Sequence, residues 1–201
     1  MPYAPPMLAP ALILASGSPR RKELLARMGL AFTVRPSDID ETPRPGEEPA
    51  ALVERLAREK AAAARPGPGE VAIAADTEVA VDGTIFGKPK DDEDAARMLR
   101  LLAGREHDVL TGVAVLAGDE GRIASGVERT RVAVASMTER EIAWYVATGE
   151  PRDKAGAYGI HGFFAIFATA VTGNYANVVG LPQPLLYRLA SEIGVDLLAR
   201  E

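Results

Sequence analysis

The polar segment Ser16–Arg21 carries the clearest chemical signal in this chain. Residues 11–15 before it are apolar, which predicts a buried strand, and Pro19 after Ser18 predicts a helix with Ser18 as its N-cap. A helix N-terminus presents unpaired backbone N–H groups and a partial positive charge, which together favour phosphate oxygens. We therefore expect a phosphate-binding turn, the alternative being a capped helix with solvated arginines. Its side chains would be Ser16, Ser18, Arg20 and Arg21.

Two acidic residues could bind a metal ion or activate water. Glu41 comes soon after a predicted strand at 31–34, and Asp76 directly follows the apolar run 71–75, which predicts a central strand. An aspartate at the end of such a strand lies in the crevice where open α/β sheets bind ligands, and carboxylates are the ligands that Mg²⁺ prefers. Glu41 and Asp76 are thus candidate metal ligands, and Asp76 is also a candidate general base. The alternatives are a solvated loop acid and a turn-forming aspartate.

Two lysines and one glycine-rich stretch are further candidates for a functional site. Lys60 falls in a helix predicted over 50–64, and Lys88 follows a predicted hairpin. Either could neutralise phosphate charge, or be an ordinary surface lysine. Residues 153–162 place three glycines around small and aromatic side chains, with His161 near the end. This pattern favours a backbone close to a flat ligand, with a bulged strand or a structural corner as alternatives.

Strands and helices are mixed along the chain, which favours an α/β fold: a mixed β-sheet with flanking helices. Strands are expected at 11–15, 31–34, 71–75, 107–117 and 121–135, and further helices at 91–102, 138–147 and 182–193. Thr138, followed three residues later by Glu141, predicts a capping box. We expect residues 1–10 to be a flexible extension and residues 11–201 a single domain with two lobes.

Composition narrows the class of protein. The chain of 201 residues is 47% hydrophobic and 25% charged, as in soluble globular proteins, and its net charge of −5 weighs against broad nucleic-acid binding. With no cysteine and two histidines, thiolate and multi-histidine metal sites are excluded. No apolar run approaches the roughly 20 residues that span a membrane, and no signal peptide is recognisable. We therefore expect a cytoplasmic protein without a membrane partner.

Taken together, these motifs resemble the Maf (septum-formation protein) family of nucleoside triphosphate pyrophosphatases. They follow the family's order from about residue 11 to 195. The matching segments are residues 14–21, Asp40-Glu41, Glu59-Lys60, residues 75–77, residues 87–89, residues 153–160 and residues 179–182. The resemblance implies an α/β fold of two lobes around a central nucleotide-binding cleft, similar to that of inosine triphosphate pyrophosphatases.

The resemblance also implies a reaction: hydrolysis of a nucleoside triphosphate between its α and β phosphates, with a divalent cation, magnesium or manganese. On this resemblance, Asp76 is the proton acceptor for the attacking water. The family's other active-site positions are Ser18, Arg21, Glu41, Lys60 and Lys88, and the positions associated with substrate choice are Arg20, Thr77 and His161. A homodimer is implied by resemblance alone.

Residues 153–160 resemble the branch that acts on dTTP and UTP. That branch has glutamine where this chain has His161, so the preferred base stays open, as do the metal and whether the substrate is a normal or a modified nucleotide. Two other hypotheses are a regulator of cell division that binds nucleotides without turnover, and nucleic-acid binding through Arg20-Arg21-Lys22. Pyrophosphate release separates the enzyme from both.

Overall fold

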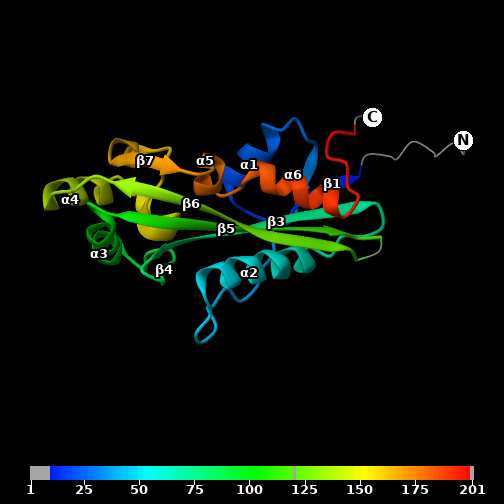
Figure 1. The fold of residues 1–201 in the computed structure, drawn as a ribbon, viewed down its shortest axis with the longest axis horizontal. Helices are drawn as coiled ribbons and strands as arrows, with labels where there is room; N and C mark the ends of the chain where they lie inside the picture. Colours follow the sequence, from blue (N-terminus) through cyan, green and yellow to red (C-terminus); the bar gives the residue numbers. More distant parts are fainter. Residues whose placement is uncertain (1–9, 120, 200–201) are drawn as a thin grey trace, which may run out of the picture.

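A seven-stranded mixed sheet with helices on both faces forms the centre of the computed structural model, which describes residues 10–119 and 121–199 (Figure 1). The strands are β1 (Ala11–Leu14), β2 (Phe32–Val34), β3 (Glu70–Val81), β4 (Thr84–Phe86), β5 (Glu106–Ala117), β6 (Ile123–Val134) and β7 (Ala168–Thr172). The helices are α1 (Pro19–Ala26), α2 (Pro49–Ala63), α3 (Asp92–Leu102), α4 (Glu139–Ala147), α5 (Tyr175–Val179) and α6 (Gln183–Glu192). Three short 3₁₀ turns lie at Glu150–Asp153, Ala155–Ala157 and Phe163–Ile166.

The strand order is β2-β1-β3-β5-β6-β7, with β4 paired to β3. β1 is parallel to β2 and β3, whereas the other pairs are antiparallel. The predicted fold class, a mixed sheet with flanking helices, is therefore confirmed. The expected extension at residues 1–10 lies outside the described residues except for Pro10, and the single domain over 11–201 stays a prediction.

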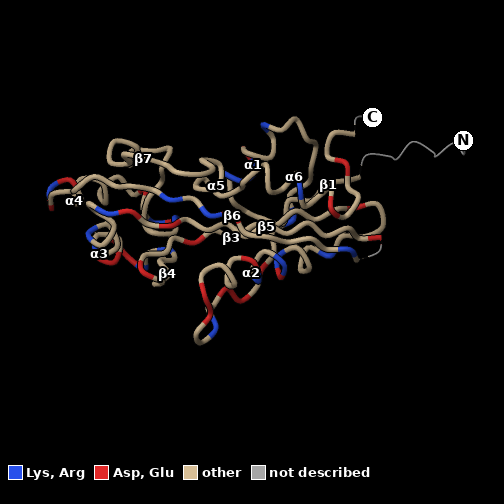
Figure 2. Tube along the Cα trace, in the orientation of Figure 1, with Lys and Arg blue, Asp and Glu red and all other residues tan. Residues whose placement is uncertain are grey.

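Helices cover the sheet unequally. α2 packs on β3 and β5 from one face, and α5 and α6 pack on β5 and β6 from the other (Figure 1). One large apolar cluster, which contains Leu14, Ile73 and Leu186, lies under α1 and α6, and the other, which contains Leu99 and Tyr145, includes α3 and α4. α2 contributes to a smaller cluster. Acidic and basic residues are interspersed over the elements (Figure 2). Among the helices described, none is long and apolar enough to span a bilayer.

Two local predictions differ from the structure. β3 does not end at Asp76 but continues to Val81, because β5 stays paired with it from Val71 to Ala80 after its parallel neighbour β1 has ended. The segment 148–181 contains β7, α5 and the three 3₁₀ turns, none of which the sequence predicted. These elements are only three to five residues long, too short to show a periodicity. The predicted caps at Ser18 and Thr138 are confirmed.

Gly112 sets how closely α2 approaches the sheet. This residue lies in the middle of β5, directly opposite Asp76 of β3. A Cβ atom at Gly112 would lie 2.1 Å from the carbonyl oxygen of Val53 in α2, far inside a van der Waals contact. The absence of a side chain therefore allows the backbone of α2 to lie directly on the sheet next to Asp76.

We predict that Gly112→Ala destabilises the protein by about 1–3 kcal/mol or more, because α2 must move outward to admit the methyl group. Urea unfolding measures the loss. Gly126→Ala in β6 is the matched control, since its Cβ would meet no atom closer than 3.4 Å and should change the stability little. Equal effects of the two substitutions would contradict this account of the packing.

Candidate active site

All ten residues that the sequence singled out line one cavity of about 460 Å³. They are Ser16, Ser18, Arg20, Arg21, Glu41, Lys60, Asp76, Thr77, Lys88 and His161. They come from six separate parts of the chain: the turn before and into α1, the loop before α2, α2 itself, β3, the loop after β4 and the segment between the second and third 3₁₀ turns. The fold therefore gathers the predicted residues at a single site.

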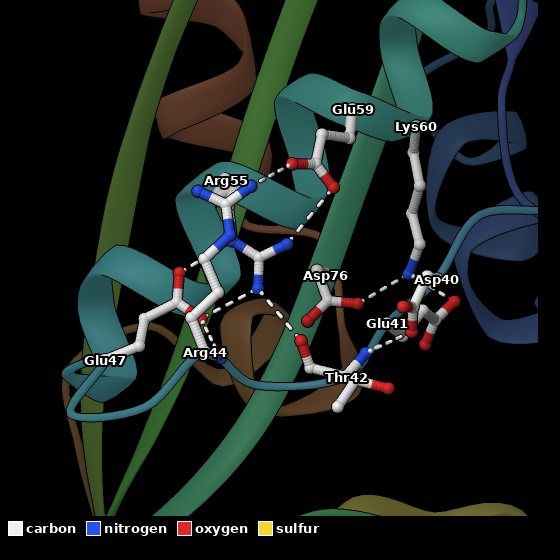
Figure 3. Close-up of polar contacts among 9 residues, drawn as sticks. All are labelled: Asp40, Glu41, Thr42, Arg44, Glu47, Arg55, Glu59, Lys60 and Asp76. Carbon is white, nitrogen blue, oxygen red and sulfur yellow. Dashed lines mark hydrogen bonds and ion pairs between the residues drawn. The ribbon is translucent and has the colours of Figure 1, made fainter.

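A buried ion pair lines the cavity, and Figure 3 shows its contacts. The Nζ atom of Lys60 lies 2.6 Å from Oδ1 of Asp76 and 2.9 Å from Oε1 of Glu41. Lys60 is 7% exposed and Asp76 is 5% exposed, whereas about half of the Glu41 side chain is exposed. One ammonium group is thus shared by two carboxylates, one inside the protein and one at the cavity rim.

The position of Lys60 follows from the pattern of α2. The buried face of this helix comprises Pro49, Leu52, Val53, Leu56, Ala57, Lys60 and Ala61, so Lys60 continues an apolar stripe toward the sheet. A lysine at such a position must find a counter-charge, because burying an isolated ammonium is very unfavourable. Asp76 supplies that charge. The sequence analysis placed Lys60 on this helix but left open that it is an ordinary surface lysine. Its spacing of four residues from Leu56 is the signal for the buried face.

Asp76 has unused capacity for a ligand. Its Oδ2 atom is buried and has no hydrogen-bond partner among the described residues, although buried carboxylate oxygens are normally paired. No group of three or more acidic or histidine side chains in the described part of the chain is arranged around a common metal position. With Oδ2 of Asp76 unpaired and Glu41 half exposed, these two carboxylates fit a cation such as Mg²⁺, which commonly takes one or two carboxylates and completes its shell with phosphate and water oxygens.

The turn into α1 is organised by Arg21. Its guanidinium donates to the Gly180 carbonyl at 2.9 Å, to Oγ1 of Thr77 at 3.1 Å and to Oγ of Ser16 at 3.3 Å. Ser18 caps the helix by accepting from the backbone N–H of Arg21. Burial lowers the pKa of Arg21, with the charge of Asp76 opposing that effect. The arginine remains a cation and joins α1, β3 and the end of α5 at the cavity wall.

Thr77 belongs to a hydroxyl chain on the other face of β3. Its Oγ1 atom lies 2.9 Å from Oγ1 of Thr111, which donates to the carbonyl of Asn177 in α5. Asn177 is fully buried, and its amide donates to Val109 and Thr130. This network fixes the short helix α5 and hence the Gly180 carbonyl that Arg21 contacts. Nothing in the sequence analysis singled out Asn177.

Another part of the cavity lining comes from the segment 153–161. Arg20 donates to Asp153 at 2.9 Å, and Lys154 contacts the same carboxylate at 2.7 Å. Burial acts to raise the pKa of Asp153, but these hydrogen bonds prevail and lower it to about 2. Partial burial, followed by the charges of Arg20 and Lys154, lowers the pKa of His161, so its ring is neutral at neutral pH. A neutral imidazole offers one donor and one acceptor.

Two further charged residues line the cavity. Lys88 is exposed, and within the described residues its ammonium makes no ion pair or hydrogen bond, so it is free to meet a ligand anion. Glu78, which the sequence analysis missed, lies on the same face of β3 as Asp76 because strand side chains alternate. Burial raises the pKa of Glu78 to about 8, and the charges of Asp76 and Glu41 act in the same direction. The sequence signal for Glu78 is its spacing of two residues from Asp76 in one strand. That signal could not be used as long as the strand was expected to end at Asp76.

A family model and similar proteins of known name point to the same family. A family model described as Maf-like protein matches residues 11–193. A protein of Anaeromyxobacter dehalogenans strain 2CP-C, named dTTP/UTP pyrophosphatase, is 55% identical over 177 residues, which cover 87% of this chain and 90% of that protein. A protein of the same name from Koribacter versatilis strain Ellin345 is 49% identical over 185 residues, covering 92% of this chain and 95% of the relative.

Similarity to solved structures is weaker. A structure titled as a HAM1 protein from Coxiella burnetii has a TM-score of 0.47 and 17% sequence identity, and the match covers 63% of this chain and 74% of that one. A similarity of this size adds nothing to the fold described above.

We predict that Lys60→Met destabilises the protein by about 3–5 kcal/mol, because it leaves a buried carboxylate on Asp76 without a counter-charge. The double substitution Lys60→Met with Asp76→Asn removes that charge and should recover most of the loss. Urea unfolding of the two variants measures both values. A double variant no more stable than Lys60→Met would contradict a direct interaction between the two side chains.

Proposed function

The chain belongs to the family of Maf-like proteins, and from this premise we propose that it is a nucleoside triphosphate pyrophosphatase that hydrolyses dTTP and UTP. The products would be the nucleoside monophosphate and pyrophosphate. The observation that carries the proposal is the shared ammonium of Lys60 between Asp76 and Glu41, in the same cavity as the N-terminus of α1. Carboxylates beside an anion-binding helix end are unfavourable for phosphate unless a cation and a reaction require them.

The proposed hydrolysis depends on the charged side chains of the cavity and on the unpaired Oδ2 atom of Asp76. In our proposal, Oδ2 of Asp76 accepts a proton from the water that attacks the α-phosphorus, and Lys60 holds the same carboxylate by its other oxygen. Glu41 and Asp76 would hold the divalent cation, magnesium or manganese, which when bound offsets the negative charge of the phosphates. Lys88, which lines the same cavity, would offset the charge that develops on the leaving pyrophosphate.

The phosphate chain and the base would occupy opposite ends of the cavity. We propose that Ser16, Ser18 and Arg21 line the phosphate end, where hydroxyls and the start of α1 lie together. Arg20, on the same turn, forms an ion pair with Asp153, so it lies between that end and the segment that carries His161. His161 would then read the base edge and, with Thr77 and Arg20, influence substrate choice.

The proposal extends to the cellular compartment, the partners and the oligomeric state of the enzyme. We expect it to act in the cytoplasm on free nucleotides, without nucleic-acid or membrane partners. A homodimer stays a prediction, as does the choice between normal and modified pyrimidine nucleotides.

We predict that purified protein with Mg²⁺ releases pyrophosphate from dTTP and UTP faster than from CTP, GTP or ATP. Asp76→Asn should lower turnover by at least about 100-fold, because the amide cannot accept the proton of the attacking water. Nucleotide binding, measured by calorimetry, should be largely kept in this variant. Normal turnover by Asp76→Asn would remove Asp76 from its role. Binding without turnover by the unmodified protein would instead favour a regulator that binds nucleotides.

We predict that His161→Gln increases the preference for dTTP and UTP by about 10-fold, since one good hydrogen bond to a base edge discriminates by about 1–3 kcal/mol. The amide presents donor and acceptor together, whereas the imidazole has them on separate nitrogens. The preference of the unmodified protein should also weaken as the pH falls through the lowered pKa of His161, because protonation removes the acceptor. The glutamine variant should lack that pH dependence. An unchanged substrate profile would mean that position 161 does not read the base.

A further inference from the structure

The carboxylate of Glu41 is carried by a segment with no regular structure. Residues 35–48, between β2 and α2, form neither helix nor strand, and the segment extends away from the sheet beside α2 (Figures 1 and 2). Loops are usually more mobile than the elements they connect. A carboxylate that must meet a buried lysine and a metal ion needs a tighter constraint than such a segment provides by itself.

Arg55 supplies a constraint of this kind (Figure 3). Its guanidinium donates to both carboxylate oxygens of Glu47, from Nε at 2.6 Å and from Nη2 at 2.7 Å. It also donates to the backbone carbonyl of Thr42 at 3.3 Å, one residue after Glu41, and to Glu59 at 3.1 Å. A single side chain of α2 thus holds the loop at two points.

The loop reinforces these contacts from its own side. Arg44 donates its backbone N–H to Glu47 at 2.9 Å and its guanidinium to Glu59 at 3.2 Å. The hydrogen bond from Arg55 is the main cause that lowers the pKa of Glu47 to about 2, so the carboxylate stays charged. The loop and α2 are therefore joined by a connected network of charges. We call Arg44, Glu47, Arg55 and Glu59 the loop clamp.

The ion pair between Arg55 and Glu47 is more deeply buried than the surface ion pairs. The side chain of Arg55 is 14% exposed and that of Glu47 is 9% exposed. Among the ion pairs in the described residues, only the Lys60–Asp76 pair has both partners as well buried, at 8% and 7%. Exposed ion pairs contribute little to structure, whereas breaking a buried one is strongly unfavourable. The loop clamp is therefore a firm attachment.

The clamp and the lysine of the site lie on one rigid element. Arg55 and Lys60 both belong to α2, five residues apart, and Glu59 precedes Lys60 directly. Fixing Thr42 and Glu47 to this helix fixes the position of Glu41 relative to Lys60. The 2.9 Å contact between Glu41 and Lys60 is the result.

We propose that Arg55 is a positioning residue of the active site, which acts by holding the loop so that Glu41 stays beside Lys60 and Asp76. The inference rests on the proposed function, since it assigns Arg55 to that reaction. Displacing a reacting group by about 1 Å can lower a rate by about 100-fold. Loss of the clamp should therefore act on turnover, while the α1 turn and the His161 end of the cavity, which Arg55 does not contact, continue to bind the nucleotide.

The kinetic test compares Arg55→Met with a matched control. Arg100→Met breaks a similar two-pronged pair with Glu139 on α3 and α4, outside the cavity. We expect Arg55→Met to lower kcat for dTTP by about 10- to 100-fold with little change in KM, and to raise the Mg²⁺ concentration needed for half-maximal rate. Arg100→Met should leave all three values unchanged. Glu47→Gln breaks the clamp from the loop side and should lower kcat and raise the Mg²⁺ requirement in the same way. This second variant tests the proposal if Arg55→Met does not fold.

A spectroscopic test does not depend on activity. The chain has no cysteine, so Pro43→Cys, at an exposed loop position, accepts a single nitroxide label. Its spectrum should be that of a restrained label in the otherwise unmodified protein and should become mobile when Arg55→Met or Glu47→Gln is added. Arg100→Met should have no such effect.

Either of two results would overturn the inference: full kcat in a folded Arg55→Met or Glu47→Gln variant, or a label that stays restrained in both. Absence of turnover in the unmodified protein is a different result, which contradicts the proposed function itself. The label would then still report whether Arg55 holds the loop.

Discussion

The buried contact between Lys60 and Asp76 is the constraint on which the rest of the structure depends. It requires that α2 lie directly on the sheet, and Gly112 permits this because a side chain there would collide with the helix backbone. It also requires a counter-charge for each partner, because neither can be buried alone. Lys60 and Asp76 neutralise each other, and Glu41, which reaches Lys60 from the loop outside the core, leaves one negative charge over among the three groups. The Lys60–Asp76 pair thus ties α2 to β3, and Glu41 adds the loop before α2.

The remaining parts of the cavity are arranged around that contact. On the opposite face of β3, hydroxyl groups link Thr77 to Thr111 and to α5, and Arg21 joins them to the start of α1. Adjacent residues of one strand thus serve two faces: Asp76 contacts Lys60, and Thr77 contacts Arg21 at the turn into α1. The loop clamp adds the one component that the sheet cannot position. Separate elements thus carry separate parts of the site, and all of them are joined through β3 and α2.

Much of this arrangement is predictable from the sequence where a local signal exists. Ser18 before Pro19 indicated a capped helix, and the apolar run before Asp76 indicated the strand that carries it. The resemblance to a known family contributed Glu41, Lys60 and Lys88, which are ordinary in isolation. Contacts between distant residues gave no local signal: nothing links Arg55 to Glu47, or Arg20 to Asp153, before the fold is known. Short elements such as α5 lacked any periodicity.

In the proposed reaction, Asp76 directs the attacking water at the α-phosphorus of the substrate. Hydrolysis of dTTP in water enriched in oxygen-18, followed by mass spectrometry of the products, tests this directly. Attack at the α-phosphorus predicts one heavy oxygen in the nucleoside monophosphate and none in the pyrophosphate. Heavy oxygen in pyrophosphate, or release of labelled orthophosphate with a nucleoside diphosphate, would contradict the account.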